Sequence, residues 1–350
     1  MIKIDEYIKN QRLESYKIVQ NRKIIYLDNK YWVLISKQNR ETNPAKRLFL
    51  DKVQKLSESG KCIFPISEIT FFELLKYHNN DGLKQTIAIV DKLSKGISII
   101  NIDERKQLEF SHFYNKNLGK EVHKSKELVW TKLVFILGYD KLSLLPTESL
   151  QKSFYNLINN KPLFEIVNEL IKDDNISFSY KDDVDTLNKN KIKYANENKS
   201  FEQMFFSELA GYLGLCGNSF KDAVVHIFHK EKGYFPTDSE IELIDENKLI
   251  NLVYQSFKNK KITDELPIFR IIPELFASLR WDKERKYKDG NDTFDILHAS
   301  FALPYCDYFF TEDELCNKII QRKLNEIYNC EVMSKTNDIL NVLNTIMQDE

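Results

Sequence analysis

The stretch from Asn291 to Asp313 constrains the fold more than any other part of the chain. It consists of a helix start, a short segment that is apolar on nearly all helical faces, a proline, and a short apolar run that ends near an acidic residue. A helix that is apolar all round is buried, and Pro304 is typical of the position after a helix. The run from Tyr308 to Thr311 then predicts a strand in the core of a sheet. The stretch therefore predicts a buried helix–strand unit of an α/β fold.

Acidic residues stand at both ends of this unit. Asn291 or Asp292 can cap the helix, and Asp295 is expected in its first turn, where the helix dipole favours negative charge. Asp313 follows the strand, at the edge where open α/β sheets bind ligands. Each acid also has a structural interpretation, Asp295 as a partner of the helix dipole and Asp313 as a turn residue. The pattern indicates that two carboxylates can converge at one edge of the unit.

The first hundred residues predict a related arrangement. Apolar, β-branched runs indicate strands at residues 23–27, 61–65 and 97–100. Between them, helical spacing of apolar residues predicts helices at 33–36, 45–57, 68–77 and 83–93. Strands that alternate with helices are typical of a parallel sheet with right-handed crossovers. The start of the chain and its last acidic stretch therefore belong to one sheet.

A long helical and polar region separates these two parts. Helices are expected at residues 121–137, 148–158, 163–171, 201–213, 221–229, 240–257 and 271–279. Residues 172–199 are rich in Asp, Asn and Lys, which predicts an exposed or mobile loop. Near the end, a strand is expected at 330–333 and a helix at 337–347. The predicted division is an N-terminal helix in 1–20, a discontinuous α/β domain in 21–103 and 291–335, a helical insertion in 104–290, and a C-terminal helix in 336–350.

The composition narrows the class of protein. A hydrophobic content of 42% with 29% charged residues predicts a packed globular protein, and a net charge of -1 gives no global basic field for polyanions. The five cysteines lack the paired spacing of zinc sites or disulfide scaffolds, which favours a reducing compartment. No apolar run is long enough for a signal core or a membrane span. We therefore expect a cytoplasmic protein without a membrane partner.

Four acids occupy positions that favour a shared site. Asp28 ends the first expected strand, and Glu73 lies in an apolar run of the helix after the second. Together with Asp295 and Asp313 they are expected at the carboxyl edge of the sheet. Clustered carboxylates repel one another unless a cation compensates them, and oxygen ligands suit Mg²⁺ or Mn²⁺ better than zinc. Asp28 can instead cap the next helix, and Glu73 can pair with Lys76.

Four segments together resemble a PIN domain, a family of metal-dependent nucleases that act mostly on RNA and have a parallel sheet with an acidic pocket. The segments are Tyr26–Asn29, Pro65–Ile69 with Phe72–Leu74, Asp295–Ala302, and Phe310–Asp313. The resemblance implies a three-layer fold with a central parallel sheet, here interrupted by an insertion longer than the PIN core itself. It also implies an endoribonuclease of single-stranded or structured RNA, with a possible protein regulator. PIN toxins are compact, so the long insertion of this chain is a departure from them.

The resemblance also implies roles for the four acids. Asp28, Asp295 and Asp313 would bind the divalent ion, and Glu73 would complete the catalytic site. A bound Mg²⁺ or Mn²⁺ would activate water and neutralise charge on the phosphoryl group. Glu312 and Asp292 are alternatives that shift the register by a few positions.

Further residues are candidates for supporting or substrate-binding roles. Asn29 can hydrogen-bond a metal-bound water, and Asp292 can support the site or cap its helix. His298 lies one helical turn after Asp295, where it can orient a water or contact phosphate, although a buried core histidine is the commoner case.

A basic and aromatic segment runs directly into the acidic helix. It contains Arg280, Arg285 and Lys286 together with Trp281 and Tyr287. Interleaved basic and aromatic side chains can hold phosphates and stack bases. A solvated charged linker has the same composition.

Two other functions remain open at this point. One is a catalytically inactive PIN-like scaffold that binds RNA or a protein through the helical insertion. The other is a phosphatase of the haloacid dehalogenase type, which also begins with an Asp at a strand end. That family needs a second Asp two residues later, where this chain has Lys30.

Overall fold

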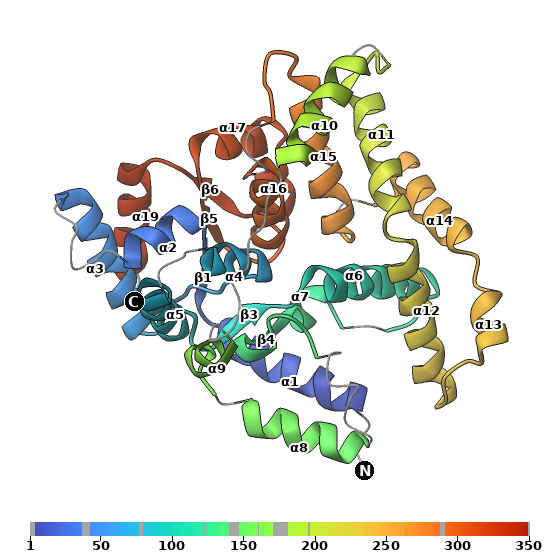
Figure 1. Ribbon diagram of the computed structural model, residues 1–350, viewed down its shortest axis with the longest axis horizontal. Coiled ribbons are helices and arrows are strands. Elements are labelled where there is room, and N and C mark those ends of the chain that lie inside the picture. The colour runs from blue at the N-terminus through green and yellow to red at the C-terminus, as the bar shows by residue number, and fades with distance from the viewer. Residues whose placement is uncertain are drawn as a thin grey trace.

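The computed structural model describes residues 4–36, 43–76, 80–121, 123–139, 147–159, 161–170, 181–194, 197–262, 264–287 and 291–348. Figure 1 shows a mixed α/β protein in which helices surround a small central sheet. Four strands form this sheet in the order β2-β1-β5-β6, and every neighbouring pair is parallel. The expectation of an α/β chain with a parallel sheet is confirmed. The strands are β1 (Lys23–Leu27), β2 (Cys62–Ile63), β5 (Tyr308–Phe310) and β6 (Glu331–Met333).

The pairing of β1 with β5 joins the two distant parts of the sequence. Ile25 pairs with Tyr308 and Leu27 with Phe310, so the first strand of the chain lies beside the strand that follows the buried helix. Both strands end at the same edge of the sheet. The residues directly after them are therefore brought together, as the sequence predicts.

Helices cover both faces of this sheet, because successive strand residues point to opposite sides. Ile24 and Tyr26 belong to a core built mainly with the helices of the insertion and α16, whereas Ile25 and Leu27 pack in a second core with α2, α3, α5 and α19. The helices outside the insertion are α1 (Ile4–Val19), α2 (Asn29–Ser36), α3 (Pro44–Glu58), α4 (Glu68–Leu75), α5 (Asn80–Ser94), α16 (Asn291–Ala302), α17 (Asp313–Gln321), α18 (Leu324–Tyr328) and α19 (Thr336–Gln348).

The third expected strand pairs differently from the others. β3 (Ile97–Ile99) is antiparallel to β4 (Trp130–Lys132), and only an isolated parallel bridge from Ser98 to Ile66 links it to the segment after β2. The helix expected at residues 121–137 is wrong for the part that is described. The chain forms the short helix α7 (Ser125–Leu128), then β4, then a 3₁₀ turn at Leu133–Phe135. Trp130 and Thr131 are fully buried, and their aromatic and β-branched side chains favour a strand.

One other helix prediction needs correction, and three further helices were not predicted. α6 (Ile102–Asn117) was not expected, although Asn101 caps it by accepting a hydrogen bond from the Glu104 amide. The helix expected at 240–257 is two helices, α13 (Asp238–Glu242) and α14 (Glu246–Lys258), because the Asp245 side chain caps the second one. The helices α17 and α18 after β5 were also not expected. The remaining helices of the insertion are α8 (Glu148–Ile158), α9 (Leu163–Leu170), α11 (Phe201–Gly214), α12 (Gly217–Lys232) and α15 (Pro267–Trp281).

The loop expected at residues 172–199 is wrong over much of its length. Residues 181–193 form the helix α10 (Lys181–Lys193), while residues 171–180 and 195–196 lie outside the described part of the chain. Its sequence is polar, so local pattern gives little helical signal. Contacts with distant segments hold it instead, including hydrogen bonds from the Lys191 ammonium to the carbonyl oxygens of Leu279 and Asp282, both 2.6 Å long.

A buried ionic cluster fastens the insertion to the α/β part. Arg105 and Glu109 on α6 are both fully buried and form an ion pair of 3.2 Å. The Tyr305 hydroxyl donates to Glu109 over 2.7 Å, and the amide of Ile268 donates to its other oxygen over 2.9 Å. Since these residues come from α6, α15 and the turn after α16, the apolar core runs continuously through the insertion.

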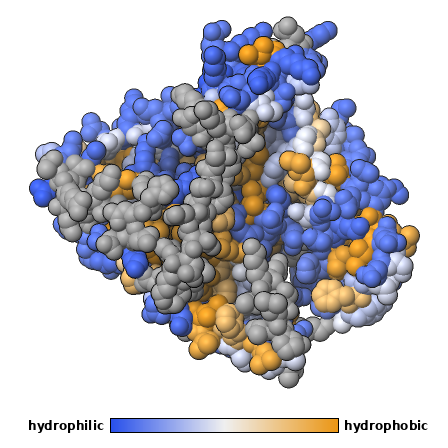
Figure 2. Space-filling model, in the orientation of Figure 1, coloured by the Kyte–Doolittle hydropathy of each residue, from blue (hydrophilic) through white to orange (hydrophobic). Residues whose placement is uncertain are grey.

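The surface gives few further signals. Figure 2 shows hydrophilic side chains over much of the visible face, with apolar patches toward the right-hand edge, where α13 lies. Leu243 and Phe235 are exposed in this region. No helix in the described part of the chain is long and apolar enough to cross a membrane.

Candidate active site

Asp28 stands at the carboxyl end of β1 and is almost completely buried, with 6% of its surface exposed. Its amide donates to the Phe310 carbonyl oxygen over 3.0 Å, which continues the pairing of β1 with β5 by one residue. One carboxylate oxygen, Oδ2, accepts a hydrogen bond of 2.9 Å from the Thr311 hydroxyl. The carboxylate is therefore oriented by the strand that carries the later acids.

Asp295 lies one turn inside α16, near the carboxyl edge of the sheet, and the pKa of its carboxyl group is strongly raised. Burial, together with the negative charges of Asp28, Glu312 and Asp292, raises the pKa of its carboxyl from 3.8 to about 7, while His298 opposes this shift. No hydrogen bond or ion pair reaches its carboxylate from the residues that the structure describes. The expectation that Asp295 occupies the first helical turn is wrong, because Asp292 takes that place.

The two acids after β5 have different neighbours. Glu312 is the residue before α17 and Asp313 is its first residue, and both side chains are exposed. Glu312 raises the pKa of Asp295, and Asp313 does not contribute to that shift. Both acids raise the pKa of Tyr31, which is raised first by burial and then by Asp28. The structure thus brings Asp28 and Glu312 within electrostatic reach of Asp295, whereas Asp313 acts on Tyr31 and not on Asp295.

Glu73 joins the site through a histidine. Its carboxylate accepts a hydrogen bond of 2.7 Å from Nε2 of His298. Nδ1 of His298 shares a 2.8 Å hydrogen bond with the Tyr26 hydroxyl, which also lies 2.6 Å from the Ser67 hydroxyl. His298 is buried, which lowers its pKa, but Tyr26, Glu73 and Asp28 together raise that pKa well above its usual value.

This arrangement assigns His298 to the core rather than to a reacting group. Both ring nitrogens are already bonded, and the ring is 1% exposed, so it has no free atom for phosphate. As an imidazolium it places a positive charge between Glu73 and the acids Asp28 and Asp295. Lys76, the alternative partner of Glu73, lies 3.8 Å above the ring of Phe294 and also feels the Glu73 charge.

Two residues of the first turn of α2 face the same edge. Oδ1 of Asn29 is buried and has no hydrogen-bond partner among the described residues. The Lys30 ammonium donates to the Thr311 carbonyl oxygen over 2.7 Å, which ties α2 to the end of β5. A buried amide oxygen without a donor is costly to retain, so Asn29 is suited to a ligand or water beside Asp28.

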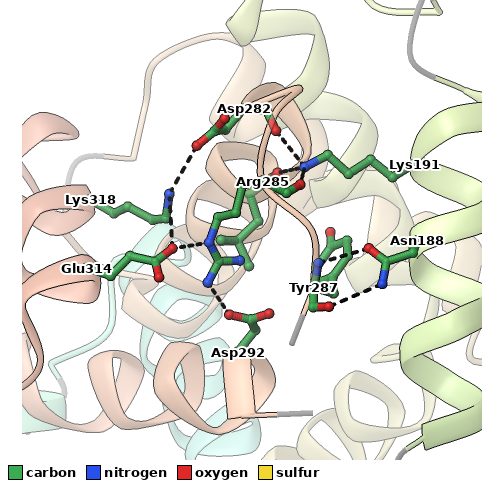
Figure 3. A network of polar contacts seen from close by, with 9 residues as sticks. Asn188, Lys191, Asp282, Arg285, Tyr287, Asp292, Glu314 and Lys318 are labelled. Atoms are coloured by element: carbon green, nitrogen blue, oxygen red, sulfur yellow. Dashed lines mark hydrogen bonds and ion pairs between the residues drawn. The ribbon is translucent and has the colours of Figure 1, made fainter. Parts of the chain in front are cut away.

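The segment Asp282–Tyr287, which we call the strap, follows α15 and contacts the starts of α16 and α17. Figure 3 shows Arg285 reaching from the strap to Asp292 at the start of α16 and to Glu314 in the first turn of α17. Lys318 lies 3.9 Å from Glu314 and 3.8 Å from Asp282. Arg285, Asp292, Glu314 and Lys318 line a small cavity of about 20 Å³ together with Asp295.

The basic residues predicted to hold substrate are therefore mostly engaged already. Arg280 pairs with Glu208 of α11, and Arg285 pairs with Asp292 and Glu314. Lys286 is exposed. The strap connects α16 and α17, because its Arg285 pairs with Asp292 and with Glu314. Asp295 has no such direct partner among the described residues.

The available donor atoms are oxygens, which hard cations prefer, but the described residues do not form a complete set of metal ligands. No three His, Cys, Asp or Glu side chains in the described part of the chain are arranged to hold a metal ion. However, Asp28 and Asp295 form a buried like-charge pair, and Asn29, the residue after Asp28, has a buried side-chain oxygen without a hydrogen-bond partner among the described residues. Oxygen donors of this type suit Mg²⁺ or Mn²⁺.

Sequence reasoning missed two features of this edge, the Thr311 hydroxyl on Asp28 and the link from Glu73 through His298. The Thr–x–Asp spacing after β5 and the i, i+3 spacing of Asp295 and His298 were the available signals. Comparisons with known proteins add nothing to this geometry, since no family model, curated protein or solved structure matches the chain.

Proposed function

We propose that the chain is a PIN-like, divalent-metal-dependent endoribonuclease that hydrolyses RNA phosphodiester bonds. The observation that carries this proposal is the pair Asp28 and Asp295, two carboxyl groups at the carboxyl edge of a parallel sheet. Burial and mutual repulsion raise the pKa of Asp295 to about 7, and no protein cation contacts it directly among the described residues. Folded proteins retain such an arrangement mainly where its charge is used.

In this proposal Asp28 and Asp295 hold Mg²⁺ or Mn²⁺, with Glu312 or Asp313 at the open side. The bound ion supplies an activated water and neutralises charge on the phosphoryl group. Thr311 and Lys30 fix the orientation of the strand ends, and Asn29 can accept a hydrogen bond from a water in the site. Glu73 and His298 act as positioning residues, because the imidazolium balances the acids from inside the core.

RNA is the proposed substrate, and a cytoplasmic location fits the cysteines. All five are buried free thiols, which suits a reducing compartment. The helical region between β3 and α16 would then select the RNA or respond to a protein regulator.

The test is cleavage of a labelled single-stranded RNA with Mg²⁺, with Mn²⁺ and with EDTA. The wild type is expected to cleave only with a divalent ion, and Asp28→Asn and Asp295→Asn to lose this activity. Glu127→Gln is a suitable control, because Glu127 is a partly exposed residue of α7 that pairs with His123. Equal cleavage by the wild type and both aspartate variants would contradict the proposal.

A second candidate is a catalytically inactive PIN-like scaffold that binds RNA or a protein. Two observations favour it. The described residues include no ready metal-ligand group, and Glu73 already bonds His298. RNA binding with no metal-dependent cleavage under any of these conditions would support the scaffold.

A further inference from the structure

A cavity of about 380 Å³ lies between α10, α11 and α15. It is separate from the small cavity that contains Asp295. Its walls are mainly apolar and include four aromatic side chains, Tyr194, Tyr212, Phe276 and Tyr287. We call it the aromatic pocket. Its volume falls within the range of about 300–1,000 Å³ that is usual for small-ligand sites.

Charged groups also line the aromatic pocket. Arg280 of α15 and Glu208 of α11 form an ion pair at its wall, and Lys191 of α10 lies 5.8 Å from the centre of the Tyr287 ring. The pair places hydrogen-bond donors and acceptors side by side at the edge of an otherwise apolar cavity. A flat ring with polar edges complements such a surface.

The wall formed by the strap is held in place by α10. Figure 3 shows the Asn188 side chain bonded to the backbone of Tyr287 at both its N–H, over 2.9 Å, and its C=O, over 3.2 Å. The Lys191 ammonium binds the carbonyl oxygens of Leu279, Asp282 and Arg285. These contacts hold the backbone of Tyr287 and of the strap in place before any ligand arrives, which lowers the entropic cost of binding.

The aromatic pocket adjoins the acidic edge through the same strap. Tyr287 lines the pocket, whereas Arg285, two residues earlier, lines the small cavity that contains Asp295. Two residues of extended chain span at most about 7 Å. A ligand that extends along the strap can therefore occupy the pocket and approach the acids at once.

We propose that the aromatic pocket binds one unpaired base of a single-stranded RNA whose backbone runs along the strap toward Asp295. This inference rests on the proposed function and names its substrate as unpaired RNA rather than duplex. Bases stack on aromatic side chains with little dependence on sequence, and a basic groove that follows the backbone usually accompanies them. Lys283 and Lys286 are exposed on the strap, as are Asp282 and Glu284, and with Arg285 the strap carries one more basic than acidic residue.

The test measures binding in EDTA, where cleavage is not required. A fluorescein-labelled single-stranded RNA of about eight nucleotides is titrated with the full chain, beside an abasic version and a duplex of equal length. The wild type is expected to bind the single strand about 10-fold more tightly than the abasic strand or the duplex. Tyr194→Ala should lower affinity for the single strand about 10-fold and leave the abasic strand unaffected.

Two matched variants control for folding and for general loss of an aromatic group. Tyr194→Phe keeps the ring and is expected to bind like the wild type. Tyr234→Ala removes an exposed tyrosine outside the pocket and should also bind normally. Equal affinity of Tyr194→Ala and the wild type, or equal affinity for abasic and normal RNA, would overturn the proposal.

The test also separates this inference from the proposed function. Base-dependent binding without metal-dependent cleavage would remove the nuclease assignment and leave the pocket intact. Normal cleavage with no effect of Tyr194→Ala on binding would do the reverse. Binding of N-acetyltryptophanamide instead of RNA, lost in Tyr194→Ala, would assign the pocket to an aromatic side chain of a protein partner and contradict the inference.

Discussion

The acidic edge, with Asp28 and Asp295, and the Glu109 cluster, with Arg105, Glu109 and Tyr305, both contain buried carboxyl groups. The two regions differ in whether other protein groups compensate the carboxylate charge. Glu109 is fully buried and receives hydrogen bonds from Arg105, Tyr305 and the amide of Ile268. Asp295 is less buried, yet its strongest charged neighbour is another acid, Asp28, and no donor reaches it from the described residues. One region satisfies its charge within the protein, and the other leaves it unsatisfied.

This difference separates a structural role from a functional one. A buried carboxylate with a full set of donors needs no ligand, and removing a donor is costly. A buried carboxylate without donors destabilises the fold unless something binds it, so its retention indicates use. The two regions lie at opposite ends of α16, since Ser300 and Tyr305 contact Arg105 or Glu109 while Asp295 opens toward the sheet edge.

The largest expected effect concerns the satisfied cluster. Arg105→Met leaves Glu109 buried without its cation and should lower the free energy of unfolding by about 3–5 kcal/mol. Urea denaturation measures this change. Lys92→Gln breaks an exposed pair with Glu58 and should leave the free energy of unfolding nearly unchanged. A similar small loss for both variants would show that the Glu109 cluster does not fasten the insertion.

The second prediction concerns the unsatisfied edge. Asp295→Asn and Asp28→Asn should reduce metal-dependent RNA cleavage at least about 100-fold, because each removes a negative ligand of the ion. In EDTA near neutral pH, Asp295→Asn should be as stable as the wild type or more so, since it relieves repulsion by Asp28. Loss of activity together with marked destabilisation would contradict the comparison.

The third prediction is the pH dependence of stability without divalent ions. The pKa of Asp295 rises from 3.8 to about 7 in the folded protein, so the folded state binds more protons between these values. Its contribution is fully present below about pH 4 and is lost as pH rises through about 7, by an amount on the order of 4 kcal/mol.

Urea denaturation of the wild type and Asp295→Asn at several pH values between about 4 and 8 measures this loss. Glu68, whose pKa is also raised to about 7, mainly by burial, gives a fall of the same sign in both proteins. The difference between the two curves isolates Asp295. Parallel curves would mean that Asp295 is not perturbed.

The smallest expected effect distinguishes the two acids after β5. Both are exposed, so each should matter less than Asp28 or Asp295, on the order of 10-fold in cleavage. Glu312→Gln is expected to lower the rate more than Asp313→Asn, because Glu312 is the one that acts on Asp295. The reverse order would favour the register in which Asp313 faces the ion.

The local pattern of apolar and polar residues was enough to predict the elements whose residues are nearly all buried. β1 is apolar along nearly its whole length, and its bounds agree with the expectation. α10 could not be predicted from its polar sequence, because the contacts of Asn188 and Lys191 with the strap hold it in place. β4 was missed because Trp130 and Thr131 are compatible with a helix until β3 pairs with them.

The site divides in the same way. The position of Asp28 follows from the end of β1, and strand pairing places it at the edge beside α16, where Asp295 lies one turn further along the helix than expected. Which acid is neutralised depends on side chains from distant elements, so the Arg285–Asp292 pair and the His298–Glu73 bond could not be predicted.

The most direct test of the central claim is Mn²⁺ binding followed by electron paramagnetic resonance. The account predicts that the wild type binds the ion at the unsatisfied edge, and that Asp28→Asn and Asp295→Asn each weaken binding at least about 10-fold. Lys92→Gln, which leaves this edge untouched, should bind like the wild type. Equal Mn²⁺ affinity in the wild type and both aspartate variants would contradict the claim that these two acids hold a metal ion.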